Sequence, residues 1–294
     1  MRLYDDIVLN GERAIARSYA KINITLDVLG RRPNGYHDVK MIMQTTGLFD
    51  LLIVDKEPYG LSVTTNLKYL PPAEKNIAWK AASAFFEYCN IRGGAKMLIH
   101  KNVPVAAGLA GGSGNAAAVI CALDKLYNTH LSDEDLCKIG AKLGADVPFC
   151  ILGGTQLAEG IGEQLTELTP MPKTTVLLVK PPINISTAKI YEKIDSCEDL
   201  KHPDTDKVIK AINKGDIKTI AANLSNVMEA VTERENPIIT KIKEMMMRDG
   251  AIGCVMSGSG PTVFGIFDDD AKAKTSADNF YNPYKEVYLT RTYN

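Results

Sequence analysis

The stretch VPVAAGLAGGSGNAAAVICAL, from Val103 to Leu123, packs four glycines into seven residues ahead of an alanine-rich run. The run predicts a helix, and GAKMLIHKNVP before it predicts a strand, so the order is strand, glycine loop, helix. Backbone N–H groups and the helix dipole at such a helix start favour a phosphate. Glycines that only turn the chain or allow tight packing are the alternative. The Walker A and GxGxxG spacings are not met, and the protein-kinase HRD and DFG motifs are absent.

Composition narrows the class of protein. The chain has 294 residues, 45% of them hydrophobic and 23% charged, and a formal net charge of -1. The apolar content is sufficient for a hydrophobic core. Because the net charge is close to zero, the chain as a whole does not attract nucleic acid or an anionic membrane electrostatically. Six scattered cysteines without a CxxC pair indicate reduced, buried thiols. The sequence shows no signal peptide and no bilayer-spanning run, so we expect a cytoplasmic protein.

Two patterns near the N-terminus predict a hairpin. Apolar residues alternate in AKINITLDVLG, which predicts a strand whose polar face carries Lys21 and Asn23. Asn34-Gly35 is a turn signal, and the alternation resumes at Val39. Tyr36 and His37 then lie on the hairpin tip.

Helix signals follow in the middle of the chain. Asn76 is a predicted N-cap, and Ser132 opens a capping box for a helix in DEDLCKIGAKL. Asp146 lies just past the predicted end of that helix. The glycine-rich stretch 153–168 loses its periodicity and is the candidate domain boundary.

Three blocks of the sequence together resemble the GHMP kinases. The central motif of that family reads approximately P-x-x-x-G-L-[GS]-S-S-A, and Pro104, Gly108, Leu109 and Ser113 hold the matching places. AKINITLDVLGRRPNGYHDVKMIMQTT and VMSGSGPTVFGIF resemble the other two blocks. AKIN, RPNGYH, GADVPFC and SGSGPTVFG are similar to one branch, which uses ATP to phosphorylate the 2-hydroxyl of 4-diphosphocytidyl-2-C-methyl-D-erythritol in the non-mevalonate isoprenoid pathway.

The resemblance implies an α+β fold in two domains, which we place at 1–158 and 159–294. The N-terminal domain would be ribosomal-S5-like, with a left-handed βαβ crossover that breaks the usual right-handed rule. The C-terminal domain would be ferredoxin-like. ATP with Mg²⁺ is the implied phosphoryl donor.

The glycine loop is the implied nucleotide site. Its residues are Pro104, Ala106, Ala107, Gly108, Leu109, Ala110, Gly111, Gly112, Ser113 and Gly114. The family usually has more glycine here and two adjacent serines, whereas this chain has three alanines and Gly114. A cradle of backbone N–H groups survives these changes if the alanines need not adopt a positive φ. Ser113 is then the loop serine left to bind Mg²⁺.

Phosphoryl transfer needs a base for the attacking hydroxyl and cations for the developing charge. The resemblance makes Asp146 the base and Lys21 its cationic partner, which also favours ionisation of the hydroxyl. Without the resemblance, a solvated strand lysine and a loop carboxylate are the ordinary interpretation.

The resemblance also assigns a substrate site: Asn23, Tyr36, His37, Thr187, Tyr191, Gly258, Ser259 and Gly260. Two tyrosines, Tyr36 and Tyr191, would sandwich the cytosine, and His37 would bond to its edge. The alternatives are a surface hairpin tip, a core aromatic at Tyr191 and a plain turn in SGSG. His100, His130 and His202 have no metal-ligand spacing.

Two other functions stay open at this point. One is another small-molecule GHMP kinase, acting on mevalonate, homoserine or a sugar, and NGYH with Tyr191 favours a cytidine diphosphate instead. The other is a non-catalytic sensor of the same fold, against which Lys21 and Asp146 argue. We expect a small-molecule substrate and no nucleic-acid or membrane partner, with monomer and homodimer both open.

Overall fold

The computed structural model describes residues 2–71, 73–197 and 200–294. The chain folds into two compact units, which alternate along the sequence. Unit 1 holds Met1–Ala20, Leu48–Val105 and Ala110–Gly153, and unit 2 holds Lys21–Gly47, Ala106–Leu109 and Gly154–Asn294. Strands β2 (Arg13–Arg31) and β3 (His37–Glu57) run through both units. The predicted boundary after residue 158 falls inside strand β6 (Thr155–Glu159) and stays a prediction.

Unit 1 is built on strands in the order β1-β2-β3-β5-β4. They are β1 (Val8–Asn10), the first part of β2, the last part of β3, β4 (Gly60–Thr65) and β5 (Gly94–His100). β4 and β5 pair in parallel, and helix α1 (Ile77–Cys89) connects them. This connection is the βαβ crossover of the unit, and its predicted left hand stays a prediction.

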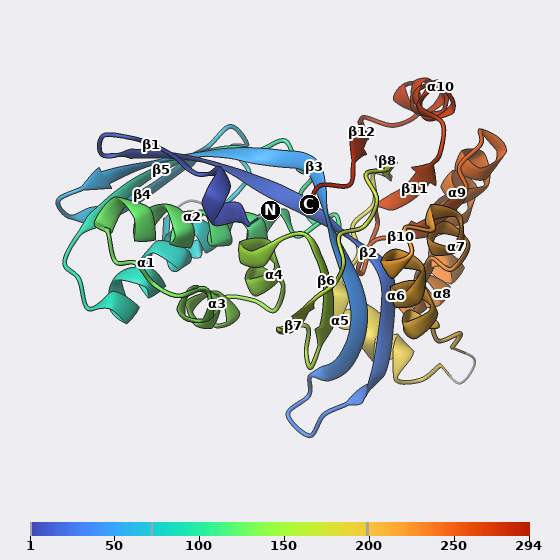
Figure 1. The fold of residues 1–294 in the computed structure, drawn as a ribbon, viewed down its shortest axis with the longest axis horizontal. Helices are drawn as coiled ribbons and strands as arrows, with labels where there is room; N and C mark the ends of the chain where they lie inside the picture. Colours follow the sequence, from blue (N-terminus) through green and yellow to red (C-terminus); the bar gives the residue numbers. More distant parts are fainter. Residues whose placement is uncertain (1, 72, 198–199) are drawn as a thin grey trace. The chain divides into compact units, whose positions relative to one another are not determined.

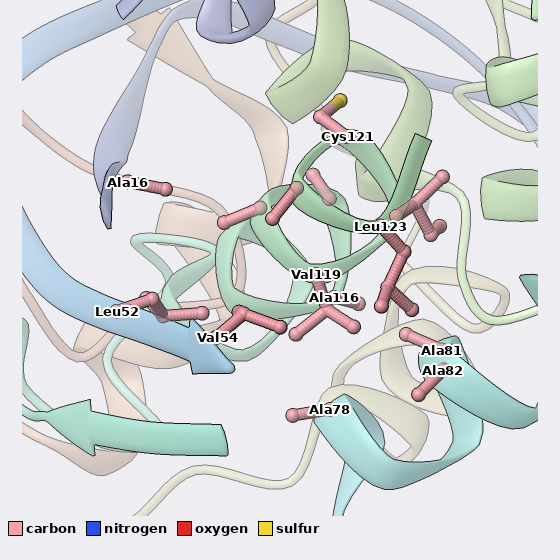
Figure 2. Close-up of a cluster of buried hydrophobic side chains, with 14 of the residues drawn as sticks. Ala16, Leu52, Val54, Ala78, Ala81, Ala82, Ala116, Val119, Cys121 and Leu123 are labelled. Atoms are coloured by element: carbon pink, nitrogen blue, oxygen red, sulfur yellow. The ribbon is translucent and has the colours of Figure 1, made fainter. Parts of the chain in front are cut away.

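Four helices of unit 1 lie together on one side of its strands (Figure 1). They are α1, α2 (Gly111–Tyr127), α3 (Asp133–Ala141) and α4 (Asp146–Leu152). Two short 3-10 helices also occur: η1 (Leu3–Asp6) precedes β1, and η2 (Ala73–Lys75) precedes α1. The core of unit 1 is rich in small side chains. Among them are Ala78 and Ala82 of α1 and Ala116 of α2, which belong to one buried cluster (Figure 2). Small side chains let two helices approach closely. Most of α2 from Gly114 to Leu126 is buried, whereas Gly112 in its first turn is exposed.

Both predicted N-caps of unit 1 are confirmed. Asn76 Oδ1 accepts a hydrogen bond from Ala78 N at 3.0 Å, and Ser132 Oγ accepts one from Asp135 N at 3.1 Å. Asp146 does not lie in a loop, because it is the first residue of α4.

Unit 2 contains a second, antiparallel sheet in the order β10-β11-β8-β12. Its strands are β8 (Thr175–Lys180), β10 (Gly253–Met256), β11 (Val263–Phe267) and β12 (Glu286–Arg291). The unit has the βαββαβ order of the predicted ferredoxin-like fold. A group of helices lies between β8 and β10 in the chain, and helix α10 (Asp270–Tyr281) precedes β12. The first group is α5 (Thr187–Ile194), α6 (Thr205–Asn213), α7 (Ile217–Ala222), α8 (Val227–Glu235) and α9 (Ile238–Arg248).

The unit 2 parts of β2 and β3 pair with short strands from later in the chain. β9 (Ser225–Asn226) pairs in parallel with Thr25 and Leu26 of β2. β6 pairs with β3 and with β7 (Gln164–Glu167). The glycine-rich stretch 153–168 is therefore mostly a β-hairpin.

The six cysteines are free, as predicted, but the expectation that they are buried holds only in part. Cys121 is buried, and the other five are half-buried. Burial raises the pKa of Cys137 to about 11 and that of Cys254 to about 12, so these thiols stay protonated and unreactive at neutral pH. In the part of the chain that the structure describes, no helix is long and apolar enough to cross a membrane.

Candidate active site

The predicted helix is present as α2, but it starts at Gly111, inside the stretch predicted as the glycine loop, so that Gly111 to Gly114 form its first turn. Its N-cap is Ala110, whose methyl side chain offers no oxygen to the first-turn N–H groups. These donors are left for an anion, and the helix dipole adds partial positive charge. The helix start in unit 1 can therefore hold one end of a phosphate chain.

The alanines of the loop do not all meet the condition set by the sequence. Ala106 has φ 51° and Ala110 has φ 55°, whereas Ala107 lies outside the left-handed region. A left-handed backbone costs alanine about 1–2 kcal/mol. The condition is therefore not met at Ala106 and Ala110, where alanine adopts the left-handed turn that glycine usually provides.

Gly114 has a steric reason to lack a side chain. A Cβ built on Gly114 would lie 2.5 Å from Ser18 Oγ and 3.3 Å from the Tyr19 carbonyl oxygen, both on β2. Ser18 Oγ is buried and accepts a hydrogen bond from Asn115 Nδ2 at 3.1 Å. A second serine does not fit beside this hydroxyl, which explains the departure from the family pattern.

We expect Gly114→Ser to destabilise the protein by about 1–3 kcal/mol, as overpacking of a close contact usually does. Ser18→Ala removes the clashing oxygen, so the double variant is expected to regain most of that loss. Urea unfolding of the two single variants and the double variant measures the coupling. Strictly additive changes in the free energy of unfolding would contradict the steric explanation.

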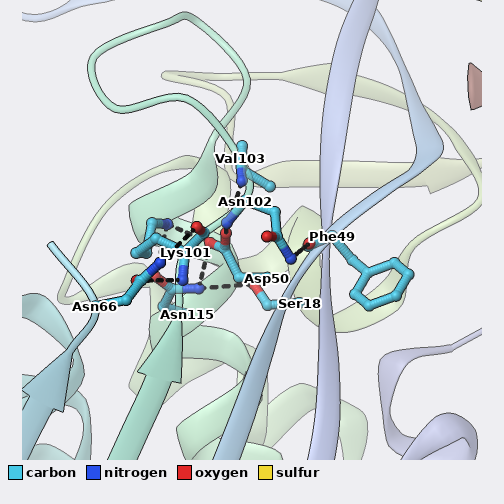
Figure 3. Close-up of polar contacts among 8 residues, drawn as sticks. All are labelled: Ser18, Phe49, Asp50, Asn66, Lys101, Asn102, Val103 and Asn115. Atoms are coloured by element: carbon cyan, nitrogen blue, oxygen red, sulfur yellow. Dashed lines mark hydrogen bonds and ion pairs between the residues drawn. The ribbon is translucent and has the colours of Figure 1, made fainter. Parts of the chain in front are cut away.

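A buried carboxylate holds the segment that enters the loop (Figure 3). Asp50, 0% exposed, accepts hydrogen bonds from Asn102 N at 2.7 Å, Val103 N at 2.8 Å and Asn115 Nδ2 at 2.8 Å. The buried Lys101 ammonium pairs with Asp50 and donates to Asn115 Oδ1 at 3.0 Å. One charged pair thus fixes both the chain before the loop and the first turns of α2, all within unit 1.

In unit 2, Lys21 and Asn23 lie on one face of β2, as the alternation predicts. Lys21 Nζ donates to Asn23 Oδ1 at 2.6 Å. Lys21 is only 4% exposed and Asn23 is fully buried. The interpretation of Lys21 as a solvated strand lysine is therefore wrong.

Two glycine-containing loops of unit 2 meet beside Lys21. Ser257 Oγ donates to the Gly108 carbonyl at 3.0 Å, and Lys21 N donates to the Leu109 carbonyl at 3.1 Å. A Cβ on Gly108 would overlap the Ser257 carbonyl oxygen, and a Cβ on Gly258 would lie 3.3 Å from Lys21 Nζ. Glycine is required here because two backbones and an ammonium group come this close.

The SGSG loop also reaches the start of α5. Thr187 and Ser259 share a hydrogen bond between their hydroxyl oxygens at 2.7 Å. This contact unites two residues of the predicted substrate site that lie 72 positions apart. The SGSG segment is therefore more than a plain turn, because it contacts the Gly108 region, Lys21 and Thr187.

The hairpin and α5 supply an aromatic cluster in unit 2. The rings of His37 and Tyr191 stack with centroids 4.5 Å apart and planes inclined by 15°. His37 Nε2 lies 2.7 Å from Asp195 Oδ1, and Arg31 also pairs with Asp195. Tyr36 is 59% exposed. The ring that stacks on Tyr191 is therefore the imidazole of His37. The sandwich of a cytosine between Tyr36 and Tyr191 stays a prediction.

The other histidines form no metal centre. His202 Nδ1 lies 2.6 Å from Asp27 Oδ1 at the surface. Over residues 2–71, 73–197 and 200–294, no three His, Cys, Asp or Glu side chains gather in a way that could hold a metal ion.

Comparison with known proteins decides the family. Family profiles for the GHMP kinases N terminal domain and the GHMP kinases C terminal match residues 76–154 and 208–286. The 4-diphosphocytidyl-2-C-methyl-D-erythritol kinase of Clostridium novyi is 48% identical over 276 residues, covering 94% of this chain and 99% of that protein. The chain belongs to the GHMP kinases, in the 4-diphosphocytidyl-2-C-methyl-D-erythritol kinase family. The Clostridium beijerinckii member is 46% identical with the same coverage.

Solved structures agree with this family. A crystal structure of 4-(cytidine 5'-diphospho)-2C-methyl-D-erythritol kinase matches with a TM-score of 0.82 and 28% identity, covering 95% of this chain and 100% of the other. The L. major mevalonate kinase matches with a TM-score of 0.72 at 16% identity and shows the fold alone. The predicted α+β GHMP kinase fold and the resemblance to ATP-dependent kinases are confirmed.

Within this kinase family fold, unit 2 brings together most of the predicted substrate residues. The contacts above link the SGSG loop to Lys21, Asn23 and Thr187. A separate stacking contact joins His37 and Tyr191. Sequence patterns missed Asp50, Lys101, Asp195 and Asn226, whose partners are distant in the chain. Only Asn226 carried a local signal, because asparagine before a helix favours an N-cap.

Proposed function

We propose that this chain transfers the γ-phosphoryl group of ATP to the 2-hydroxyl of 4-diphosphocytidyl-2-C-methyl-D-erythritol. The observation that carries the proposal is the buried Lys21–Asn23 pair beside two glycine loops, in a chain of this kinase family. A lysine ammonium is costly to bury without hydrogen-bond partners, and Asn23 Oδ1 is one such partner of Lys21 Nζ.

In this proposal Asp146 accepts the proton of the 2-hydroxyl. Lys21 stabilises the oxygen as it becomes negative, and Asn23 hydrogen-bonds the same part of the substrate. Gly258, Ser259 and Gly260 offer backbone groups to the substrate, and Thr187 supports them through its hydroxyl contact with Ser259.

The loop from Pro104 to Gly114 holds the ATP phosphates in the proposal. Its backbone N–H groups and the start of α2 supply positive potential without a lysine in the motif. Mg²⁺ typically keeps several waters and uses substrate phosphates with one or two protein oxygens, so the half-buried Ser113 fits as its loop ligand. When bound, Mg²⁺ neutralises charge on the β- and γ-phosphates.

His37 and Tyr191 form the proposed cytosine site, with Tyr36 beside them on the hairpin. His37 Nε2 lies 2.7 Å from Asp195 Oδ1, so its Nδ1 is the ring nitrogen left to face the edge of the cytosine. The near-zero net charge supports a small-molecule substrate rather than a nucleic-acid or membrane partner. A cytoplasmic location belongs to the same proposal.

Tyr191→Ala is expected to raise KM for the cytidyl substrate by about 5- to 150-fold, because stacking on one base is worth about 1–3 kcal/mol. KM for ATP is expected to stay within about twofold. Tyr191→Phe keeps the ring and serves as the control. Steady-state kinetics with each substrate varied in turn measures both constants, and equal KM values for the cytidyl substrate in wild type and Tyr191→Ala would argue against this cytosine site.

The function itself is tested by ADP release from MgATP with one acceptor at a time: the cytidyl compound, mevalonate or homoserine. Turnover confined to the cytidyl compound is expected. ADP release with another acceptor would return Tyr36, His37 and Tyr191 to structural roles. ATP binding without turnover of any acceptor would favour a sensor.

A further inference from the structure

Asn226 joins two parts of unit 2 that the proposed reaction uses. Its backbone ends β9, which pairs with Thr25 and Leu26, shortly after Lys21 and Asn23 on the same strand. Its side chain is buried, with the residue 5% exposed, at the N-cap of α8. Asn226 is thus fixed to the strand that carries Lys21.

The Asn226 side chain uses its oxygen and both donors of its amide. Oδ1 accepts from Met228 N at 3.0 Å, which is the ordinary N-cap bond. Nδ2 donates to the Met256 carbonyl at 2.7 Å and to the Gly258 carbonyl at 2.8 Å. A cap needs only the acceptor, so the two donations serve the SGSG loop.

The first turn of α8 holds Met256 from a second side. Glu229 Oε1 accepts from Met256 N at 2.8 Å, and Lys243 Nζ lies 2.7 Å from Glu229 Oε2. Burial raises the pKa of Glu229, and Lys243 favours its charged form. Both backbone polar groups of Met256 are therefore tied to α8, just before the loop begins.

We propose that Asn226 is a positioning residue that sets the distance between the SGSG loop and the strand carrying Lys21 and Asn23. Gly258, whose carbonyl Asn226 holds, is the residue where a Cβ would come within 3.3 Å of Lys21 Nζ and 3.2 Å of the Gly108 carbonyl oxygen. A shift of this carbonyl moves the loop against both. That Asn226 positions the loop does not depend on the proposed function; that the positioned loop binds the substrate does.

Asn226→Asp separates capping from positioning. Aspartate caps a helix as well as asparagine does, but a carboxylate cannot donate to the two carbonyls. Asn226→Ser keeps the capping oxygen without adding charge and has one hydroxyl donor in place of the two amide donors. Asn236→Asp adds the same charge at the other end of α8, where the Asn236 amide donates to the Thr232 carbonyl at 3.1 Å.

Two measurements test the proposal: kinetics with the cytidyl acceptor and MgATP, and amide hydrogen exchange of the whole protein. For both Asn226 variants we expect kcat to fall by about 10²-fold, the effect of a misplacement of about 1 Å. We expect exchange at Ser257 and Gly260 to quicken about tenfold or more, while exchange in α8 stays near that of the wild type. Asn236→Asp is expected to keep wild-type values in both.

Exchange at Ser257 and Gly260 that stays at the wild-type rate in both Asn226 variants would overturn the proposal. The same holds if exchange quickens equally through α8, since Asn226 would then be only a cap. If wild-type protein fails to phosphorylate the cytidyl acceptor, the proposed function fails, and the exchange data still decide whether Asn226 positions the loop.

Discussion

Asp146→Asn is expected to lower kcat for the cytidyl acceptor by about 10²- to 10⁴-fold, the usual contribution of a positioned general base. The amide keeps the shape of the side chain but cannot accept a proton at neutral pH. Because this loss arises in the transition state, KM for ATP is expected to change little. Steady-state ADP release with each substrate varied in turn measures both effects.

A matched control is available because Asp133 begins α3 just as Asp146 begins α4. Asp133→Asn removes the same favourable charge from a helix start, worth about 0.3–1 kcal/mol in stability. It is expected to leave kcat unchanged. A kcat for Asp146→Asn within about threefold of the wild type would remove Asp146 from the role of base and leave it as a helix-start carboxylate.

Gly108→Ala is expected to have the second largest effect. The new Cβ would overlap the Ser257 carbonyl oxygen at φ 74°, so the Ala106–Leu109 segment must move away from the SGSG loop. We expect kcat to fall by about 10²-fold or more, because such a shift misplaces both loops beside Lys21. Thermal unfolding and steady-state kinetics measure the two consequences.

Gly154→Ala isolates the cost of the backbone angle. Gly154 has φ 73°, and a Cβ added there would meet no atom within 4 Å, so it shares the positive φ of Gly108 without the clash. It is expected to lower stability by about 1–2 kcal/mol and to keep kcat. Equal losses of kcat in the two variants would show that close approach of the loops is not what Gly108 provides.

Local patterns predicted the elements that depend on neighbouring residues. The alternation around Lys21, the caps Asn76 and Ser132, and the helix after the glycine loop all follow from side chains within four positions. Such signals are read directly from sequence because strand and helix periods are short. The general fold and the family came from the resemblance of whole blocks.

The remaining features depend on contacts that no local pattern records. Asp50 binds the backbone at Asn102 and Val103, 52 and 53 positions away, and His37 meets Asp195 across 158 positions. The positive φ of Ala106 and Ala110 was also hidden, since alanine by itself favours the right-handed region. Tertiary contacts, rather than residue preferences, determine these parts of the site.

The pairing of β9 with β2 has a consequence for synthesis on the ribosome. Thr25 cannot form its pairing with Ser225 until the ribosome has added 200 more residues. At about 5–20 residues per second, the strand that carries Lys21 therefore emerges roughly 10–40 s before this partner exists. During that interval the nascent chain has an unpaired strand edge, the kind of surface that other chains bind. We therefore expect the yield of folded protein to depend on chaperones that cover this strand edge during synthesis.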